Sequence, residues 1–141
     1  MPSQSLQNHA AVDPMLHYLI MPLNLVLLIG ALTSLAHHHD SLHLLLVGIV
    51  FVLMLTGMKA RFYAMKNQDR IIRLEEHTRL YRLMPEEHAV ADSLTMTQFV
   101  GLRFASDAEA PELARRAVRE NLTRKQIKEA VLDWRADHHR V

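Results

Sequence analysis

The feature that most constrains the fold is a pair of long apolar runs in the first part of the chain. Residues 15–36 and 41–58 contain no Asp, Glu, Lys or Arg, and only the tetrapeptide HHHD separates them. A helix needs about 20 apolar residues to cross a hydrocarbon core of about 30 Å, and each run is close to that length. Because the link is so short, the two helices must be antiparallel neighbours. The sequence therefore predicts a transmembrane hairpin within 14–58, with helices at about 15–36 and 42–58 and an outer turn at 37–41.

The charged residues are distributed very unevenly along the chain. Residues 1–58 contain no Lys or Arg, whereas all 16 basic residues lie in 59–141. A cleavable signal peptide has a positive N-terminal region, and the segment 1–13 has none. Basic residues near a span favour the cytoplasmic side. The basic residues that closely follow the second apolar run are Lys59, Arg61, Lys66, Arg70 and Arg73. We therefore expect a cytoplasmic N-terminal segment, a cytoplasmic C-terminal part and an external HHHD turn.

The second apolar helix is expected to continue beyond the membrane. No Gly or Pro occurs between Met58 and Pro85, so nothing in the sequence breaks the helix before that proline. Residues 59–84 are therefore interpreted as a cytoplasmic helical stalk. One apolar stripe on it has the 3-4-3 spacing of a helix face. Its members are Ile71, Leu74, Thr78 and Tyr81. The stripe either packs on the tail that follows or forms a coiled-coil or partner-binding seam.

Capping boxes divide the rest of the chain into short helices. A Ser or Thr followed three residues later by Glu or Gln marks a helix start. This pattern occurs at Thr95–Gln98, Ser106–Glu109 and Thr123–Gln126. The expected helices are 96–105, 108–120 and 124–138. They form a small three-helix module within 94–141, which is marginally stable alone because of its size. The predicted class is thus an all-α membrane protein with a hairpin, a long second helix and this C-terminal module.

Several short motifs spread along the chain carry a resemblance to a known family. They are Gln7-Asn8-His9, Pro14, His17 and Pro22; Tyr63-Ala64; QDRIIRLEE at 68–76; LRFASD at 102–107; Ile127-Lys128; and WRAD at 134–137. As a set, these motifs resemble an uncharacterised family of short bacterial membrane proteins, catalogued as a domain of unknown function. The resemblance covers nearly the whole chain. It implies a bacterial source and a two-span membrane topology, and it brings no activity, cofactor or site residue.

A histidine cluster lies at the predicted outer turn. Its members are His37, His38, His39, Asp40 and His43. Imidazole and carboxylate groups suit zinc, copper or nickel. Adjacent histidines in a turn point in different directions, so a site with about four ligands would draw on two chains. The alternatives are therefore a polar loop without an ion and a divalent-metal site.

Two further groups of residues are candidates for protein–protein contact. Small residues let helix backbones approach closely in lipid, and they predict a packing seam within the hairpin, between copies or against another protein. These residues are Gly30, Ser34, Gly48 and Thr56. A dense charged patch follows the membrane exit, and it comprises Asp69, Arg70, Arg73, Glu75 and Glu76. The patch fits a docking surface, a contact with anionic lipid, or ordinary i,i+4 ion pairs of Asp69 with Arg73 and Glu75 with Arg79.

Composition excludes several classes of function. The chain has no cysteine, so disulfides, thiolate catalysis and cysteine-based metal clusters are excluded. It contains no glycine-rich phosphate loop, nucleophile elbow or HExxH motif. Region 94–141 has nine basic and seven acidic residues, which differs from the one-sided basic footprint of nucleic-acid readers. We therefore expect no nucleic-acid partner.

The sequence as a whole predicts a non-enzymatic protein of the bacterial inner membrane that needs no cofactor. We expect an accessory, assembly or scaffold subunit of a membrane complex, or a homo-oligomer. Its expected partners are the lipid bilayer and either other membrane-protein subunits or further copies of itself. The alternative is an outward-facing membrane protein that binds a divalent metal through the His37–His43 cluster.

Overall fold

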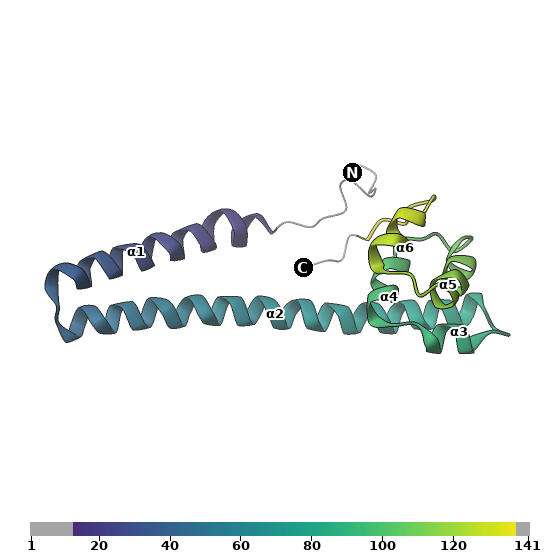
Figure 1. Ribbon diagram of the computed structural model, residues 1–141, viewed down its shortest axis with the longest axis horizontal. Helices are drawn as coiled ribbons and strands as arrows, with labels where there is room; N and C mark the ends of the chain where they lie inside the picture. The colour runs from purple at the N-terminus through teal and green to yellow at the C-terminus, as the bar shows by residue number, and fades with distance from the viewer. Residues whose placement is uncertain (1–12, 138–141) are drawn as a thin grey trace. The chain divides into compact units, whose positions relative to one another are not determined.

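The computed structural model describes residues 13–137, and within that range its regular elements are all helices (Figure 1). In chain order they are the π-helical turn η1 (Leu16–Ile20), α1 (Met21–His38), α2 (Ser41–Leu83), α3 (His88–Ser93), α4 (Met96–Leu102), α5 (Ala110–Arg119) and α6 (Arg124–Ala130). The predicted all-helical class is confirmed. The chain forms two compact units, and the boundary between them falls within α2, between Met65 and Lys66. The motif at 7–9 and the predicted segment 1–13, apart from Asp13, lie outside the described residues.

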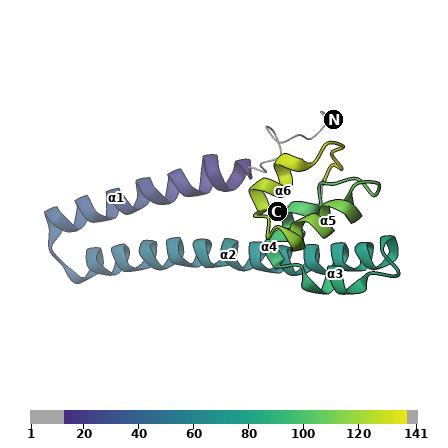
Figure 2. The ribbon, with the colours of Figure 1, turned by 45° about the vertical axis from the view of Figure 1, so that its right-hand side comes forward.

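The first unit is a hairpin formed by α1 and the N-terminal part of α2, which lie side by side (Figures 1 and 2). Half-buried positions recur every three or four residues on both helices, so each helix contacts the other along one narrow face. They include Asn24, Leu28, Ala31 and Leu35 on α1 and His43, Val47, Val50 and Met54 on α2. Most of the other hairpin side chains are exposed. Both helices are long and apolar enough to cross a membrane.

The turn of the hairpin occupies two residues and is shorter than predicted. His39 adopts the left-handed conformation, with φ 31° and ψ 33°, and its N–H closes α1 on the carbonyl of Leu35 at 3.0 Å. The carboxylate of Asp40 accepts the N–H of His43 at 2.9 Å and so caps the start of α2. Because His39 is left-handed and Asp40 caps the next helix, α1 extends to His38 and α2 begins at Ser41.

Pro22 lies at the start of α1, directly after the π-helical turn η1. Proline lacks an N–H and therefore cannot satisfy the carbonyl four residues before it. The wider π turn accommodates this irregularity. The side-chain amide of Asn24 also donates to the carbonyl of Ile20 at 2.9 Å. The irregularity caused by Pro22 thus takes the form of a π turn at the beginning of the first apolar helix.

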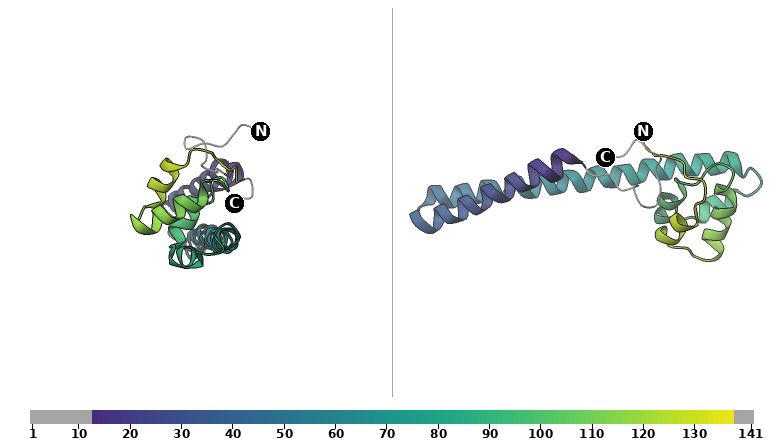
Figure 3. Two further views of the ribbon diagram at one scale, coloured as in Figure 1. Left: turned by 90° about the vertical axis from the view of Figure 1, so that its right-hand side faces the viewer. Right: turned by 90° about the horizontal axis from the view of Figure 1, so that it is seen from above.

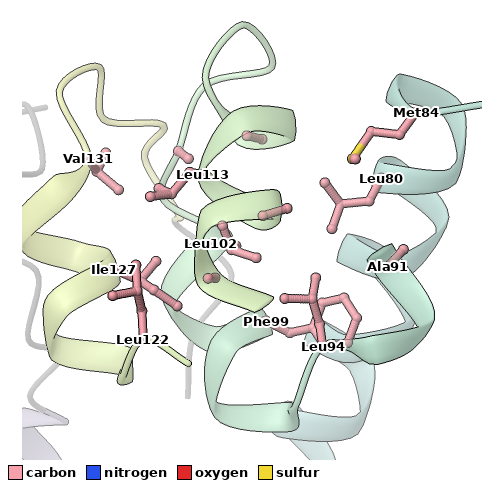
Figure 4. Close-up of a cluster of buried hydrophobic side chains, with 14 residues drawn as sticks. Leu80, Met84, Ala91, Leu94, Phe99, Leu102, Leu113, Leu122, Ile127 and Val131 are labelled. Atoms are coloured by element: carbon pink, nitrogen blue, oxygen red, sulfur yellow. The ribbon is translucent and has the colours of Figure 1, made fainter. Parts of the chain in front are cut away.

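The second unit consists of the C-terminal part of α2 with α3, α4, α5 and α6 gathered against it (Figure 3). Its core is apolar and draws on every one of these helices. The buried core residues include Leu80, Met84, Ala91, Leu94, Phe99, Leu102, Leu113, Leu122, Ile127 and Val131. Figure 4 shows Leu80 of α2 and Met84, which directly follows α2, projecting toward the other helices. The last turns of α2 are therefore part of this core.

The module differs from the predicted three-helix arrangement in two places. It contains an additional short helix, α3, between the break at Pro85 and the first capping box. Its last helix, α6, ends at Ala130 rather than at residue 138. The reason is a non-local pairing: Trp134 forms an antiparallel bridge with Ala105, and the N–H of Arg135 donates to the carbonyl of Phe104 at 2.8 Å. The chain is extended there because it pairs with a distant segment.

Two of the three predicted capping boxes are confirmed. Thr95 caps α4 and Thr123 caps α6, and in each case the glutamine three residues later reciprocates. The box predicted at Ser106–Glu109 is wrong. Glu109 is itself the N-cap residue of α5, and its carboxylate accepts the N–H groups of Leu132 and Asp133 at 3.2 and 3.3 Å. The carboxylate of Glu109 therefore binds the backbone of the distant segment at Leu132 and Asp133 and does not form a local capping box.

The second part of α2 buries a different face from the predicted apolar stripe. The residues of α2 that are buried are Ile72, Glu76, Arg79 and Leu80. By contrast, Ile71 is 56% exposed and Leu74 is 69% exposed. The interpretation that the stripe packs on the tail is therefore wrong for these two residues. The alternative, a partner-binding seam, stays a prediction.

Candidate functional site

The best-defined polar site in the second unit is centred on Arg79. All three nitrogens of its guanidinium donate hydrogen bonds: Nε to Asp107 at 2.6 Å, Nη1 to Glu76 at 2.8 Å, and Nη2 to the carbonyl of Ala105 at 2.7 Å. The side chain of Arg79 is only 7% exposed. A charge buried to this extent is tolerated only when it is paired and hydrogen-bonded, and Arg79 meets both conditions.

A second arginine completes this cluster. Glu76 is 5% exposed, and the carboxylate oxygen that does not bind Arg79 accepts from Nη1 of Arg135 at 3.2 Å. Asp107 lies at the open side, and the hydrogen bond and charge of the Arg79 guanidinium hold the pKa of its carboxyl below the usual value. Two guanidinium groups therefore face two carboxylates, and the charge of the cluster is balanced.

A pocket of about 420 Å³ opens beside this cluster. Its lining residues are Arg79, Arg82, Ser106, Asp107, Asp133, Trp134 and Arg135. The arginine side chains are hydrogen-bond donors that stay protonated, and the carboxylates are acceptors. This combination suits the recognition of polar groups on a partner, because it presents both donors and acceptors around one aromatic ring.

Three segments that are distant in sequence meet at this cluster. They are the motifs at 68–76, 102–107 and 134–137 that carried the resemblance described above. The rings of Phe104 and Trp134 lie 5.0 Å apart, and Arg103 pairs with Asp137 at 3.3 Å. Sequence reasoning did not identify Arg79 or Asp107 as site residues. The available signal was that these short motifs are rich in charged residues of both signs.

A second polar cluster fastens α3 to α2. The hydroxyl of Tyr81 donates to Oδ1 of Asp92 at 2.6 Å, and Nε2 of His77 lies 2.9 Å from the same oxygen. The ring of His88 stacks on Tyr81 with centroids 4.0 Å apart. The hydrogen bonds from Tyr81 and His77 lower the pKa of Asp92, and the bond to Asp92 raises the pKa of Tyr81. No local pattern in the sequence predicts this cluster.

Comparison with known proteins assigns the chain to a family. A family model described as a family of unknown function (DUF6526) matches residues 1–141. The chain belongs to this family. The match confirms the resemblance to a family of unknown function. No curated protein and no solved structure matches the chain.

The charged patch predicted in this DUF6526 chain is divided by the structure. Asp69, Arg70, Arg73 and Glu75 are exposed, whereas Glu76 is buried in the Arg79 cluster and cannot belong to a docking surface. The predicted pair of Glu75 with Arg79 is wrong, since Arg79 binds Glu76 and Asp107. Within residues 13–137, no ion pair joins Asp69 to Arg73.

The histidine turn of this family member is held by local contacts. Asp40 lies 2.6 Å from Nδ1 of His43 and caps α2, and Nδ1 of His37 lies 2.7 Å from the carbonyl of Thr33. The rings of His38 and His43 stack with centroids 4.7 Å apart. Within residues 13–137, no three His, Asp or Glu side chains are grouped as metal ligands would be. The predicted site of His37, His38, His39, Asp40 and His43 is not assembled in one chain.

The small residues predicted to form a membrane seam do not all face the hairpin partner. A Cβ added at Gly30 or Gly48 would meet nothing within 4 Å. Thr56 is exposed, and its hydroxyl donates to the carbonyl of Val52 one turn earlier at 2.8 Å. Ser34 is half-buried in the hairpin. Packing within the hairpin therefore does not use Gly30, Gly48 or Thr56, and a seam between copies or against another protein stays a prediction for them.

Proposed function

We propose that this chain is a non-enzymatic subunit of a bacterial inner-membrane assembly, in which a membrane hairpin carries a helical module that binds other subunits. One observation carries this proposal: α2 is a single helix of 43 residues that belongs to both units. Its first part is apolar and exposed, whereas its last turns place Glu76, Arg79 and Leu80 in the core of the module. The module is therefore built onto the apolar helix itself, with no loop between them.

The exposed apolar surface of the hairpin supports membrane insertion. No residue in the apolar windows of the two long helices is buried. Exposure of apolar surface to water costs about 25 cal/mol per Å², and lipid removes this cost. The basic residues that follow the second span, beginning with Lys59 and Arg61, favour a cytoplasmic location for the module. In this topology both termini are cytoplasmic and the histidine turn faces outward.

The chemistry of the module supports binding rather than catalysis. Each nitrogen of the Arg79 guanidinium donates to a group of the same chain, so this buried arginine holds segments together. The pocket beside it offers Arg82, Arg135 and Asp133 as hydrogen-bonding groups. Side chains of both signs around an open pocket are suited to a polar rim of a protein–protein interface. The module is thus a docking platform held at the membrane surface.

The proposal is tested by extracting the full-length protein gently from its own membranes and determining its native mass. Every co-purifying chain and metal is identified in the same sample. We expect a reproducible stoichiometric complex, either with another membrane subunit or with further copies of the chain. A stable, isolated monomer without any partner would overturn the proposal.

A further inference from the structure

One face of α2 in the second unit is apolar and exposed. Ile71 and Leu74 are 56% and 69% exposed, although they are large aliphatic residues one turn apart. They border an open pocket, and the described residues that line it are Asn67, Arg70, Ile71, Arg73, Leu74 and His77. Exposed aliphatic residues on one face of a helix mark a surface that another helix can cover.

We propose that a second copy of this chain binds this face, through a parallel two-stranded coiled coil of the two α2 helices. The inference rests on the proposed membrane anchoring, because copies inserted with the same topology present their α2 helices in the same direction. The proposed function does not specify which chain binds the module or where. Here the partner is a second copy, and the surface is the exposed face of α2.

The spacing along this face has the heptad register of a coiled coil. Ile71 and Thr78 occupy a positions, and Asn67 and Leu74 occupy d positions. A β-branched residue at a with leucine at d favours two strands over three or four. This choice of side chains therefore matches a dimer, in which Ile71 and Leu74 of one copy pack against the same residues of the other.

The charges beside the stripe are self-complementary. In this register Arg70 is a g residue and Glu75 is the e residue five positions later. A parallel dimer brings each g residue next to the following e residue of the other helix, so two Arg70–Glu75 pairs form across the twofold axis. Both side chains are exposed, and within residues 13–137 neither has an ion-pair partner. This complementarity identifies the occupant as a second copy.

The ends of the stripe are defined by its surroundings. Tyr81 follows in the same register, but its ring stacks on His88 and its hydroxyl binds Asp92, so the stripe ends before it. In the other direction, the a position before Asn67 is Ala64, which is half-buried and belongs to the first unit. The stripe in the second unit therefore runs from Asn67 to Thr78.

Cysteine cross-linking in native membranes tests the pairing, because the chain has no cysteine of its own. The variants Ile71→Cys and Leu74→Cys place one thiol on the stripe. The matched controls Asp69→Cys and Arg73→Cys place it at exposed positions of the same turns, off the stripe. A disulfide needs Cα atoms about 6 Å apart, which the twofold-related a and d positions provide and the control positions do not. After mild oxidation, we expect several-fold more disulfide-linked dimer from the stripe variants than from the controls.

Charge reversal tests the identity of the second helix. In the Leu74→Cys background, Arg70→Glu or Glu75→Arg alone should reduce the dimer several-fold, and the two changes together should restore it. Equal cross-linking at all four positions, no cross-linking at any of them, or a cross-link to a different protein would overturn the proposal. If the native-mass measurement then showed a stoichiometric complex with a different protein, the proposed function would still hold. An isolated monomer would contradict both the α2 dimer and the proposed function.

Discussion

Arg79 donates from Nη1 to Glu76 at 2.8 Å within one turn of α2, and these side chains are only 7% and 5% exposed. The pair is stable in this environment because each partner has further hydrogen bonds. Asp107 and the carbonyl of Ala105 accept from Arg79, and Arg135 donates to Glu76. The pair therefore joins the end of α2 to two segments that are distant in sequence.

Replacement of Arg79 by alanine should strongly destabilise the module. The change leaves Glu76 buried with only the long contact to Arg135, and breaking one side of a buried ion pair costs about 3–5 kcal/mol. Thermal unfolding of the full-length protein in detergent, followed by circular dichroism, measures the loss. Arg82→Ala is the matched control, because Arg82 is an exposed arginine on the same helix. If the two variants unfolded at the same temperature, the structural role assigned to Arg79 would be wrong.

The parts of this fold that could be predicted from sequence are those determined by nearby residues. The hairpin follows from two uncharged runs and a short link, and the capping boxes at Thr95 and Thr123 each involve residues only three positions apart. Both patterns depend only on residues that are close in sequence. The hairpin and the capping boxes can therefore be predicted without knowledge of the tertiary contacts.

The parts that could not be predicted depend on distant partners. Glu76 looks like a surface residue of a charged helix, but it is buried and accepts a hydrogen bond from Arg135, 59 residues later. The end of α6 is set by the pairing of Trp134 with Ala105, and α3 is only six residues long without a side-chain cap. The cluster at Tyr81 and Asp92 likewise joins two helices, and no local motif marks it.

Alanine at Gly101 should destabilise the contact between α4 and α6. A Cβ there would lie 2.9 Å from Cγ2 of Ile127 and 3.3 Å from the carbonyl oxygen of Arg124. Overpacking of this kind typically costs about 1–3 kcal/mol. Gly48→Ala is the control, since nothing lies within 4 Å of a Cβ at Gly48 and alanine is a better helix former. Unfolding midpoints of the two variants should separate clearly, and a neutral Gly101→Ala would contradict the close packing of α4 on α6.

The contribution of Asp92 to stability should disappear in acid. Hydrogen bonds from Tyr81 and His77 depress the pKa of Asp92 in the folded protein below its ordinary value of 3.8. A group with a depressed folded pKa stabilises the protein above its unfolded pKa, and this contribution is lost as the pH falls through the folded value. The midpoint difference between the natural protein and Asp92→Asn should therefore be largest near neutral pH. It should shrink steadily below about pH 4. A difference that stayed constant down to about pH 3 would contradict this account.

The orientation of the hairpin should place the histidine turn outside and the start of the module inside. The basic residues after the second span, Lys59 and Arg61 first among them, favour retention on the cytoplasmic side. Because the chain has no cysteine, the single variants His39→Cys and Glu86→Cys report the two sides without background. In spheroplasts, a membrane-impermeant maleimide should label the His39→Cys variant at once and the Glu86→Cys variant only after permeabilisation. The reverse pattern would invert the topology, and immediate labelling of both would mean that the hairpin does not separate these two residues across a membrane.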